Sequence, residues 1–178
     1  MDFADSTAPA ATRADARALA ARYVAQLNQQ LPATARYRWL VAEPVEYARY
    51  WYFAYRYEYR GPTGPADALA GAPAYLLWKH SRQLVELSWA DNPTLAERET
   101  LWQQAQQQAH NLLTGPGRPT LAQLRASLPG RPLASLPTLH RQLWALPTPA
   151  ARAAELARVL YAQALAVRQL PPLPGEPT

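Results

Sequence analysis

The stretch Tyr47–Tyr59, YARYWYFAYRYEY, holds six of the ten tyrosines, one of the six tryptophans and one of the two phenylalanines of the chain. Aromatic residues favour pleated strands, in which successive side chains point to opposite faces. The alternation therefore predicts one strand at about 49–60 with two usable faces. One face would carry Trp51, Phe53, Tyr55, Tyr57 and Tyr59, and the other Tyr50, Tyr52, Ala54, Arg56 and Glu58.

The segments around this strand predict a small α+β unit. A helix is expected over 13–30, because Thr12 and Asp15 form a capping pattern and Pro32 stops the apolar period. A strand with a period of two follows from Arg36 to near Pro44. After a loop to about Pro73, the segments 74–79 and 84–89 read as a hairpin around the turn 80–83. The order is α-β-β-β-β.

The second half of the chain has helical periodicity. Capping signals at Thr94, Thr120 and Thr148 each precede an apolar stripe, and a further helix is expected at about 137–145. The sequence thus predicts an α+β protein in which an N-terminal helix packs on a small antiparallel sheet, followed by a helical subdomain. The expected parts are an α+β domain over 12–90, a helical subdomain over 91–170 and a disordered tail over 171–178.

Composition narrows the class of protein. Hydrophobic content of 49% is enough for a buried core, and the absence of cysteine excludes disulfides, thiolate metal sites and cysteine nucleophiles. No apolar run approaches the length of a membrane span, and the N-terminus lacks the pattern of a signal peptide. We therefore expect a cytoplasmic protein that does not bind a membrane.

The positive charge is concentrated in the helical half. The net charge is +5, and all but one of the 18 basic residues are arginines, the exception being Lys79. From Trp102 to Leu170 there are seven arginines and one acid, Glu155, which gives this stretch a net charge of +6. A basic stretch of this kind attracts phosphate backbones or an acidic protein.

Residues 12–89 resemble the YrhB-like immunity domains of bacterial polymorphic toxin systems. In that family a helix precedes an aromatic strand of W-x-F character, a loop of L-x-G-x-x-P-x character and a closing hairpin of D-K-x-T-G-x-V character. Two departures stand in the hairpin, where Trp78 replaces an acid and Arg82 replaces a turn glycine. The matching positions here are Trp51, Phe53, Leu69, Gly71, Pro73 and Lys79.

The resemblance implies a non-catalytic immunity protein, or antitoxin, that neutralises a cognate protein toxin by binding it at or near its active site. Binding is also what the residues suggest, since Tyr, Trp and Arg are enriched at interface hot spots. The hairpin turn and the outer sheet face combine aromatic and charged groups on a rigid support. The residues expected at the partner interface are Tyr52, Arg56, Glu58, Trp78, Lys79, His80 and Arg82.

The outer sheet face has two possible covers. The helix is expected to cover the inner face, formed by Trp51, Phe53 and Tyr55 with Tyr75, Leu77, Val85 and Leu87. The outer face is too apolar to be bare, so either a partner or the C-terminal helices should cover it. Its residues would be Tyr50, Tyr52, Arg56, Glu58, Leu76, Trp78, Leu84 and Glu86.

Other chemistry is weakly indicated. His80 and Ser81 stand together in a turn without an orienting carboxylate, and His110 and His140 lack neighbours at metal-ligand spacing, so we expect neither an enzyme nor a metal or cofactor site. Nucleic-acid binding is the competing function. It would place Arg118, Arg125, Arg131 and Arg141 on phosphates, with Trp102 or Trp144 available for stacking.

Overall fold

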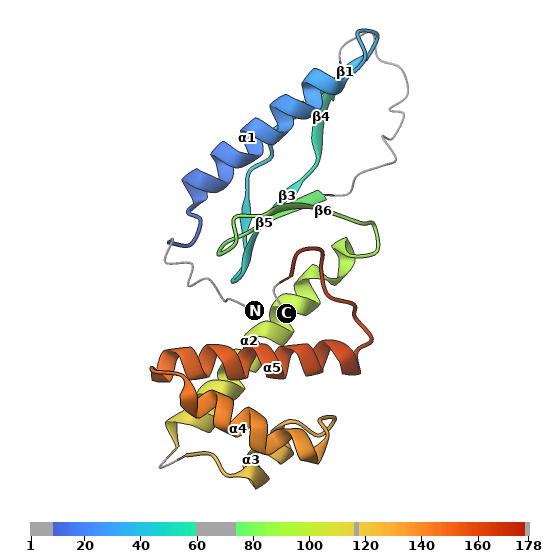
Figure 1. Ribbon diagram of the computed structural model, residues 1–178. Helices are drawn as coiled ribbons and strands as arrows, with labels where there is room; N and C mark the ends of the chain where they lie inside the picture. The colour runs from blue at the N-terminus through green and yellow to red at the C-terminus, as the bar shows by residue number, and fades with distance from the viewer. Residues whose placement is uncertain (1–8, 60–73, 116–117, 177–178) are drawn as a thin grey trace. The chain divides into compact units, whose positions relative to one another are not determined.

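The computed structural model describes residues 9–59, 74–115 and 118–176. The chain has an α+β fold that divides into two compact units (Figure 1). The first, here called the sheet unit, combines Met1–Thr94 with Leu173–Thr178, and the second, the helical unit, is Leu95–Pro172. The division after Thr94 falls four residues beyond the predicted one, and the end of the chain belongs to the first unit.

Helix α1 (Arg13–Gln30) opens the sheet unit with the predicted bounds. Thr12 and Asp15 form the expected capping box, in which the Thr12 side chain accepts from the Asp15 N–H and the Asp15 side chain accepts from the Thr12 N–H. The helix ends at Leu31, whose extended backbone is the conformation favoured before proline. Its buried residues Ala16, Ala20 and Val24 are small, which lets the helix lie close against the strands (Figure 1).

Six strands form two antiparallel sheets. A two-stranded ribbon pairs β1 with β4, and a four-stranded sheet has the order β2-β3-β5-β6. The strand bounds are β1 Tyr37–Leu40, β2 Val45–Glu46, β3 Tyr50–Ala54, β4 Arg56–Tyr59, β5 Ala74–Trp78 and β6 Leu84–Leu87. Three of the positions that match the family lie outside the described residues, namely Leu69, Gly71 and Pro73.

The aromatic stretch is two strands rather than the predicted one. Ala54 is the last residue of β3 that pairs with β5, and β4 then pairs with β1 instead. Four residues, 41–44, lie between β1 and β2, whereas three, 53–55, lie between the partners of Leu40 and Val45. This extra residue is a bulge beside Pro44, which has no N–H to donate, and it bends the long hairpin.

The register of β6 corrects the predicted faces of the sheet. Tyr75 pairs with Glu86 and Leu77 with Leu84, so Leu84 and Glu86 share the inner, α1-facing side. Val85 lies opposite Leu76 on the outer side, and Leu87 lies there too. The sequence assigned all four β6 residues to the wrong face, because alternation within a strand does not fix which set points inward.

The inner side of the sheet and α1 enclose the core of the sheet unit. Aromatic side chains from β3 and β5 dominate this core, and the Phe53 and Tyr75 rings stack with centroids 4.9 Å apart. The buried residues are Ala11, Ala16, Ala20, Val24, Trp51, Phe53, Tyr75 and Leu77.

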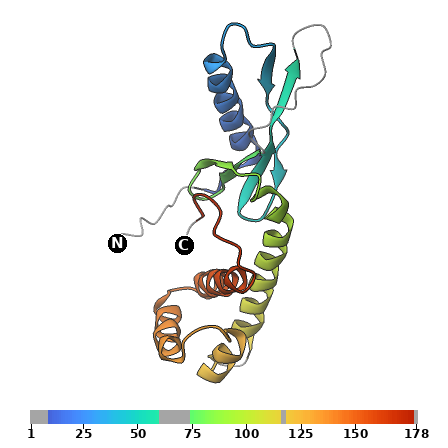
Figure 2. The ribbon, with the colours of Figure 1, turned by 90° about the vertical axis from the view of Figure 1, so that its right-hand side faces the viewer.

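The helical unit packs α2 against α5, with α3 and α4 beside each other (Figure 2). Helix α2 begins directly after Thr94, Thr120 forms a capping box with Gln123, and the Thr148 side chain accepts from the Ala151 N–H. The three helix starts predicted from threonine caps are therefore confirmed. The unit contains α2 Leu95–Thr114, α3 Leu121–Ser127, the short 3₁₀ segment Leu133–Ser135, α4 Leu136–Ala145 and α5 Pro149–Val167.

A leucine-rich core holds the helical unit together, and one charged residue lies beside it. Arg98 is 1% exposed, and its Nη2 donates to the Pro171 carbonyl at 2.8 Å. This hydrogen bond fixes the chain where it leaves α5, a role that the sequence pattern did not indicate. Within the described part of the chain, no helix has both the length and the apolar character needed to cross a membrane.

Candidate functional site

The seven residues predicted to bind a partner do not form one surface. Trp78, Lys79, His80 and Arg82 lie at the turn between β5 and β6, where Tyr50 pairs with Trp78. Arg56 and Glu58 lie in β4, beyond the opposite end of β3. Tyr52 is half-buried in the middle of β3, opposite Leu76 and Val45. The set therefore divides among the hairpin turn, the ribbon and the middle of β3.

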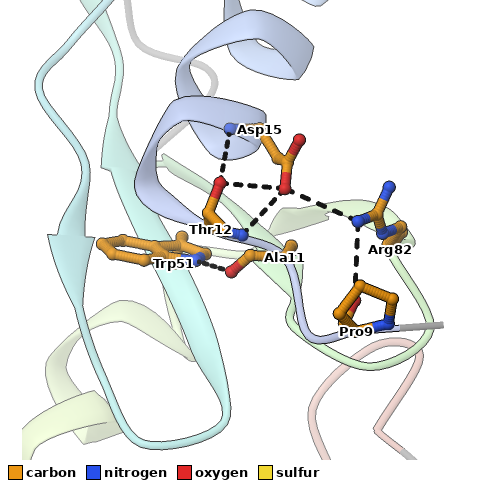
Figure 3. A network of polar contacts seen from close by, with 6 residues as sticks. All are labelled: Pro9, Ala11, Thr12, Asp15, Trp51 and Arg82. Atoms are coloured by element: carbon orange, nitrogen blue, oxygen red, sulfur yellow. Dashed lines mark hydrogen bonds and ion pairs between the residues drawn. The ribbon is translucent and has the colours of Figure 1, made fainter.

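The hairpin turn is bonded to the start of α1 (Figure 3). Arg82 Nη2 lies 3.5 Å from both the Pro9 carbonyl and Asp15 Oδ2. The Trp51 indole donates to the Ala11 carbonyl at 2.9 Å. Hydrogen bonds from the Thr12 backbone and side chain, followed by the charge of Arg82, lower the pKa of Asp15. Arg82 thus contributes to the N-terminal cap of α1.

Arg82 also shapes the turn through its backbone. Its φ is 56°, in the left-handed region that favours glycine. The turn is closed by hydrogen bonds from the Arg82 N–H to the Trp78 carbonyl and from the Trp78 N–H to the Gln83 carbonyl, both at 2.9 Å. Arg82 therefore adopts the backbone conformation of a turn glycine, at the position where glycine is usual in the YrhB-like family.

Lys79 is held by two partners. Its ammonium lies 5.0 Å from the centroid of the Trp51 ring and 2.7 Å from Glu46 Oε1, and its side chain is 13% exposed. His80, next in the turn, is exposed. Of the four turn residues in the predicted set, His80 and Arg82 are the ones with exposed side chains.

Trp78 is covered by the end of the chain, which corrects the prediction that it contacts a partner. Its side chain is 2% exposed, and its indole donates to the Pro174 carbonyl at 3.0 Å. Arg49 lies 5.5 Å from the centroid of the Trp78 ring and forms an ion pair of 2.6 Å with Glu176. The two charged side chains are 13% and 4% exposed, so this ion pair is buried.

The segment Leu173–Glu176, here called the C-terminal strap, is therefore folded. Leu173 is 2% exposed, and its N–H donates to Glu176 Oε2 at 2.7 Å within a turn. The expectation of a disordered tail over 171–178 is wrong for these four residues, while residues 177–178 lie outside the described part. The C-terminal strap, which follows the last helix, thus covers part of the outer sheet face. From the sequence, only a partner or the C-terminal helices were expected to cover this face.

The ribbon of β1 and β4 exposes two tyrosines on one of its faces. Tyr57 and Tyr59 are 37% and 38% exposed. The Tyr57 ring packs edge-on against Tyr37 and Trp39, with centroids 6.3 Å from each, so this exposed ring is held in place by its neighbours. On the other face of the ribbon, Glu58 pairs with Arg38 at 2.5 Å and Arg56 is exposed.

A cluster of tyrosines around Glu86 lies between α1 and the sheet. The hydroxyls of Tyr23 and Tyr55 are 3.1 Å apart, and both donate to Glu86. Burial, followed by the hydrogen bond to Glu86, raises the pKa of Tyr23 to about 12. Burial also raises the pKa values of Tyr55 and Tyr75. These phenols therefore stay protonated at neutral pH, and those of Tyr23 and Tyr55 donate hydrogen bonds.

The arginines of the competing hypothesis lie around α3 and α4. Arg125 and Arg131 line the same depression, Arg118 lies over the Trp144 ring, and Arg141 is exposed on α4. His110 is exposed, and the His140 ring packs edge-on against Trp144. Across 9–59, 74–115 and 118–176, no three side chains of the metal-binding types come together. Comparisons with protein-family models, curated proteins and solved structures find no match to this chain.

Proposed function

We propose that the chain is a non-catalytic immunity protein that acts in the bacterial cytoplasm by binding a cognate protein toxin. The observation that carries the binding surface is the exposed pair Tyr57 and Tyr59 on the ribbon. Large rings with polar hydroxyls, held by neighbouring aromatic side chains, give contact area at low entropic cost and are typical of interface hot spots.

The charged face of the ribbon adds to the proposed interface. Arg56 is exposed, and the Arg38–Glu58 pair has side chains 47% and 49% exposed. These charges lie on the face of the ribbon opposite Tyr57 and Tyr59, so they act over distance and steer the approach of a partner. Of the seven residues expected at the interface, the proposal keeps Arg56 and Glu58 and adds Tyr57 and Tyr59.

The choice of a toxin as partner rests on the resemblance of residues 12–89 to immunity domains. The order of helix, aromatic strand and closing hairpin supports it, and so does the left-handed backbone at Arg82. The buried Trp78 limits how far the resemblance carries, since an acid is usual at that position in the family. The ribbon, rather than the hairpin turn, is therefore proposed as the toxin-binding surface.

The test is co-expression with any toxin domain that a neighbouring reading frame encodes, followed by titration calorimetry on the purified pair. We expect the wild-type chain to restore growth and to bind the toxin. The Tyr57→Ala/Tyr59→Ala variant should bind at least about 30-fold more weakly, the effect of losing one hot-spot residue of about 2 kcal/mol.

The matched control is Trp89→Ala. Trp89 is 63% exposed in the same unit but lies outside the ribbon, so its removal should leave toxin binding unchanged. Circular dichroism establishes that both variants are folded. Equal affinity of the ribbon variant and the wild type would reject the ribbon as the surface, and absence of any binding to a toxin that the chain neutralises would reject the function.

A further inference from the structure

The helical unit contains a long stretch without acidic residues. From residue 100 to residue 154 the chain has five arginines and no Asp or Glu. The carboxylates of the unit lie outside this stretch, where Glu97 pairs with Arg168 and Glu155 with Arg158. Among the described residues, no ion pair involves Arg118, Arg125, Arg131 or Arg141. These four positive charges are not neutralised within the unit.

Two of these arginines meet at one end of the α3–α4 pair. Arg125, in the last turn of α3, and Arg131, in the following loop, line a depression of about 510 Å³ with Ala122, Ala126 and Pro129. The Nε of Arg131 donates to Ser135 Oγ at 3.2 Å, which orients this guanidinium. The other lining side chains are small and carry no charge, so the depression presents two guanidiniums to solvent.

Two further arginines lie at the other end of the pair, around Trp144. The guanidinium carbons of Arg118 and Arg152 lie 5.2 and 4.6 Å from the centroid of the Trp144 ring. The Nε of Arg152 donates to the Leu146 carbonyl at 3.1 Å. Guanidiniums already stack on this ring, so Trp144 serves as a platform for cations rather than for a base.

The two arginine groups are spaced for a charged polymer. Arg118 precedes α3 and Trp144 lies in the last turn of α4, so their contact indicates that the two helices run antiparallel. The seven residues of α3 separate the groups by about 10 Å at 1.5 Å per residue. One strand of a duplex carries a phosphate about every 3.4 Å, so the groups span about three nucleotides.

We propose that the α3–α4 pair binds the phosphate backbone of nucleic acid. Guanidiniums match phosphate geometry, and backbone contacts require no aromatic anchor. An acidic protein surface fits less well, because Leu121 and Val167 are the large hydrophobic side chains exposed in the described part of the helical unit, and the apolar core of a protein interface would have little else to contact there. This activity goes beyond toxin binding and uses the other unit.

The test is fluorescence anisotropy of the full chain with a labelled single-stranded RNA and, separately, a duplex DNA. Four phosphate contacts predict that affinity falls about 150-fold for duplex and about 50-fold for a single strand between 50 and 200 mM salt. Arg125→Gln/Arg131→Gln should weaken binding. It should also reduce the slope of log affinity against log salt by the amount that corresponds to about two phosphate contacts. Arg125→Lys/Arg131→Lys, which keeps the charge, should restore most of the salt dependence.

The control must lose the same charge elsewhere. Arg13→Gln/Arg17→Gln removes two exposed arginines of α1 that pair with Glu43, and it should leave nucleic-acid binding nearly unchanged. If this control weakened binding equally, the effect would be one of net charge alone, and the proposed site would be rejected. Absence of binding at low salt, or equally effective competition by poly-glutamate, would also overturn it.

The two proposals can be tested independently of each other. Tyr57→Ala/Tyr59→Ala should leave nucleic-acid binding unchanged, and Arg125→Gln/Arg131→Gln should leave toxin neutralisation unchanged. Loss of both activities in either variant would mean that the variant misfolds or that the two surfaces are one. Far-ultraviolet circular dichroism of each variant distinguishes these two results, and the second would overturn the separate nucleic-acid site.

Discussion

At the scale of single residues, the ion pair between Arg49 and Glu176 is the most buried charge pair among the described residues of the sheet unit. Breaking a buried ion pair by removing one of its partners costs about 3 kcal/mol. We therefore expect Glu176→Gln to lower the free energy of unfolding by about this amount, measured by denaturant titration. Glu43→Gln is the control, because Glu43 pairs with Arg17 at the exposed surface and should have little effect.

Gly175 supports the C-terminal strap through its conformation and its lack of a side chain. Its φ is +66°, and a Cβ there would lie 2.8 Å from Gln83 Oε1 and 3.1 Å from Val85 Cγ1. Gly175→Ala should destabilise the chain by at least about 1 kcal/mol, since it adds strain and crowding at once. The measurement is the shift of the denaturation midpoint.

A second glycine provides the control for this substitution. A Cβ at Gly115, at the end of α2, would meet nothing within 4 Å. Gly115→Ala should therefore leave stability unchanged or slightly raised, because it only reduces the freedom of the unfolded chain. Equal effects of the two substitutions would show that the strap does not hold Gly175 in the described conformation.

At the scale of elements, the contact between α1 and the sheet should depend on pH through the tyrosine cluster. The pKa of Tyr23 is about 12 in the folded chain, against about 10 for an unperturbed tyrosine. Between these values the unfolded chain has lost a proton that the folded chain keeps. The free energy of unfolding should therefore fall as pH rises from about 10 to about 12, as read from denaturation series over this range.

Glu86→Gln separates the causes of this raised pKa. Burial raises the pKa of Tyr23 whether or not Glu86 is charged. The Glu86 carboxylate raises it further, because it accepts a hydrogen bond from the phenol and repels the phenolate. The variant should lower the pKa of Tyr23, seen as tyrosinate absorbance appearing at a lower pH. An unchanged titration curve would contradict the described contact.

The elements also show what could be predicted from sequence. The starts of α1, α3 and α5 were predictable, because a Thr cap is a local signal that its own helix satisfies. The break of the aromatic stretch was not, since it depends on which distant strand pairs with each half. The prediction of which β6 residues face inward was wrong for the same reason. Register depends on both paired strands, whereas the sequence of one strand shows only which residues alternate.

At the scale of the whole molecule, removal of the C-terminal strap should affect the two units unequally. A chain ending at Pro172 loses the contacts of Pro174 and Glu176 with Trp78 and Arg49. Amide exchange in β3, β5 and β6 should become faster, while exchange in α2 and α5 stays unchanged. Hydrogen exchange resolved by peptide mass spectrometry measures both. Uniform acceleration would show that the two units unfold as one.

The candidate interface was predictable only as a list of residue types. Tyr, Trp and Arg in alternation indicated binding, and Arg56 and Glu58 are indeed on the surface. Trp78 has the same chemistry, yet the strap buries it from about a hundred residues further along the chain. Exposure depends on such long-range contacts, so no local pattern separates a tryptophan that meets a partner from one that the chain itself covers.

The strap also sets an order of events during biosynthesis. Arg49 and Glu176 are 127 residues apart, and a ribosome adds about 5–20 residues each second, so their ion pair must wait about 6–25 s after Arg49 is incorporated. The helices of Leu95–Pro172 are all made within that interval. They can pack before the strap arrives to cover Trp78. The unit whose synthesis begins first is thus the last to be completed.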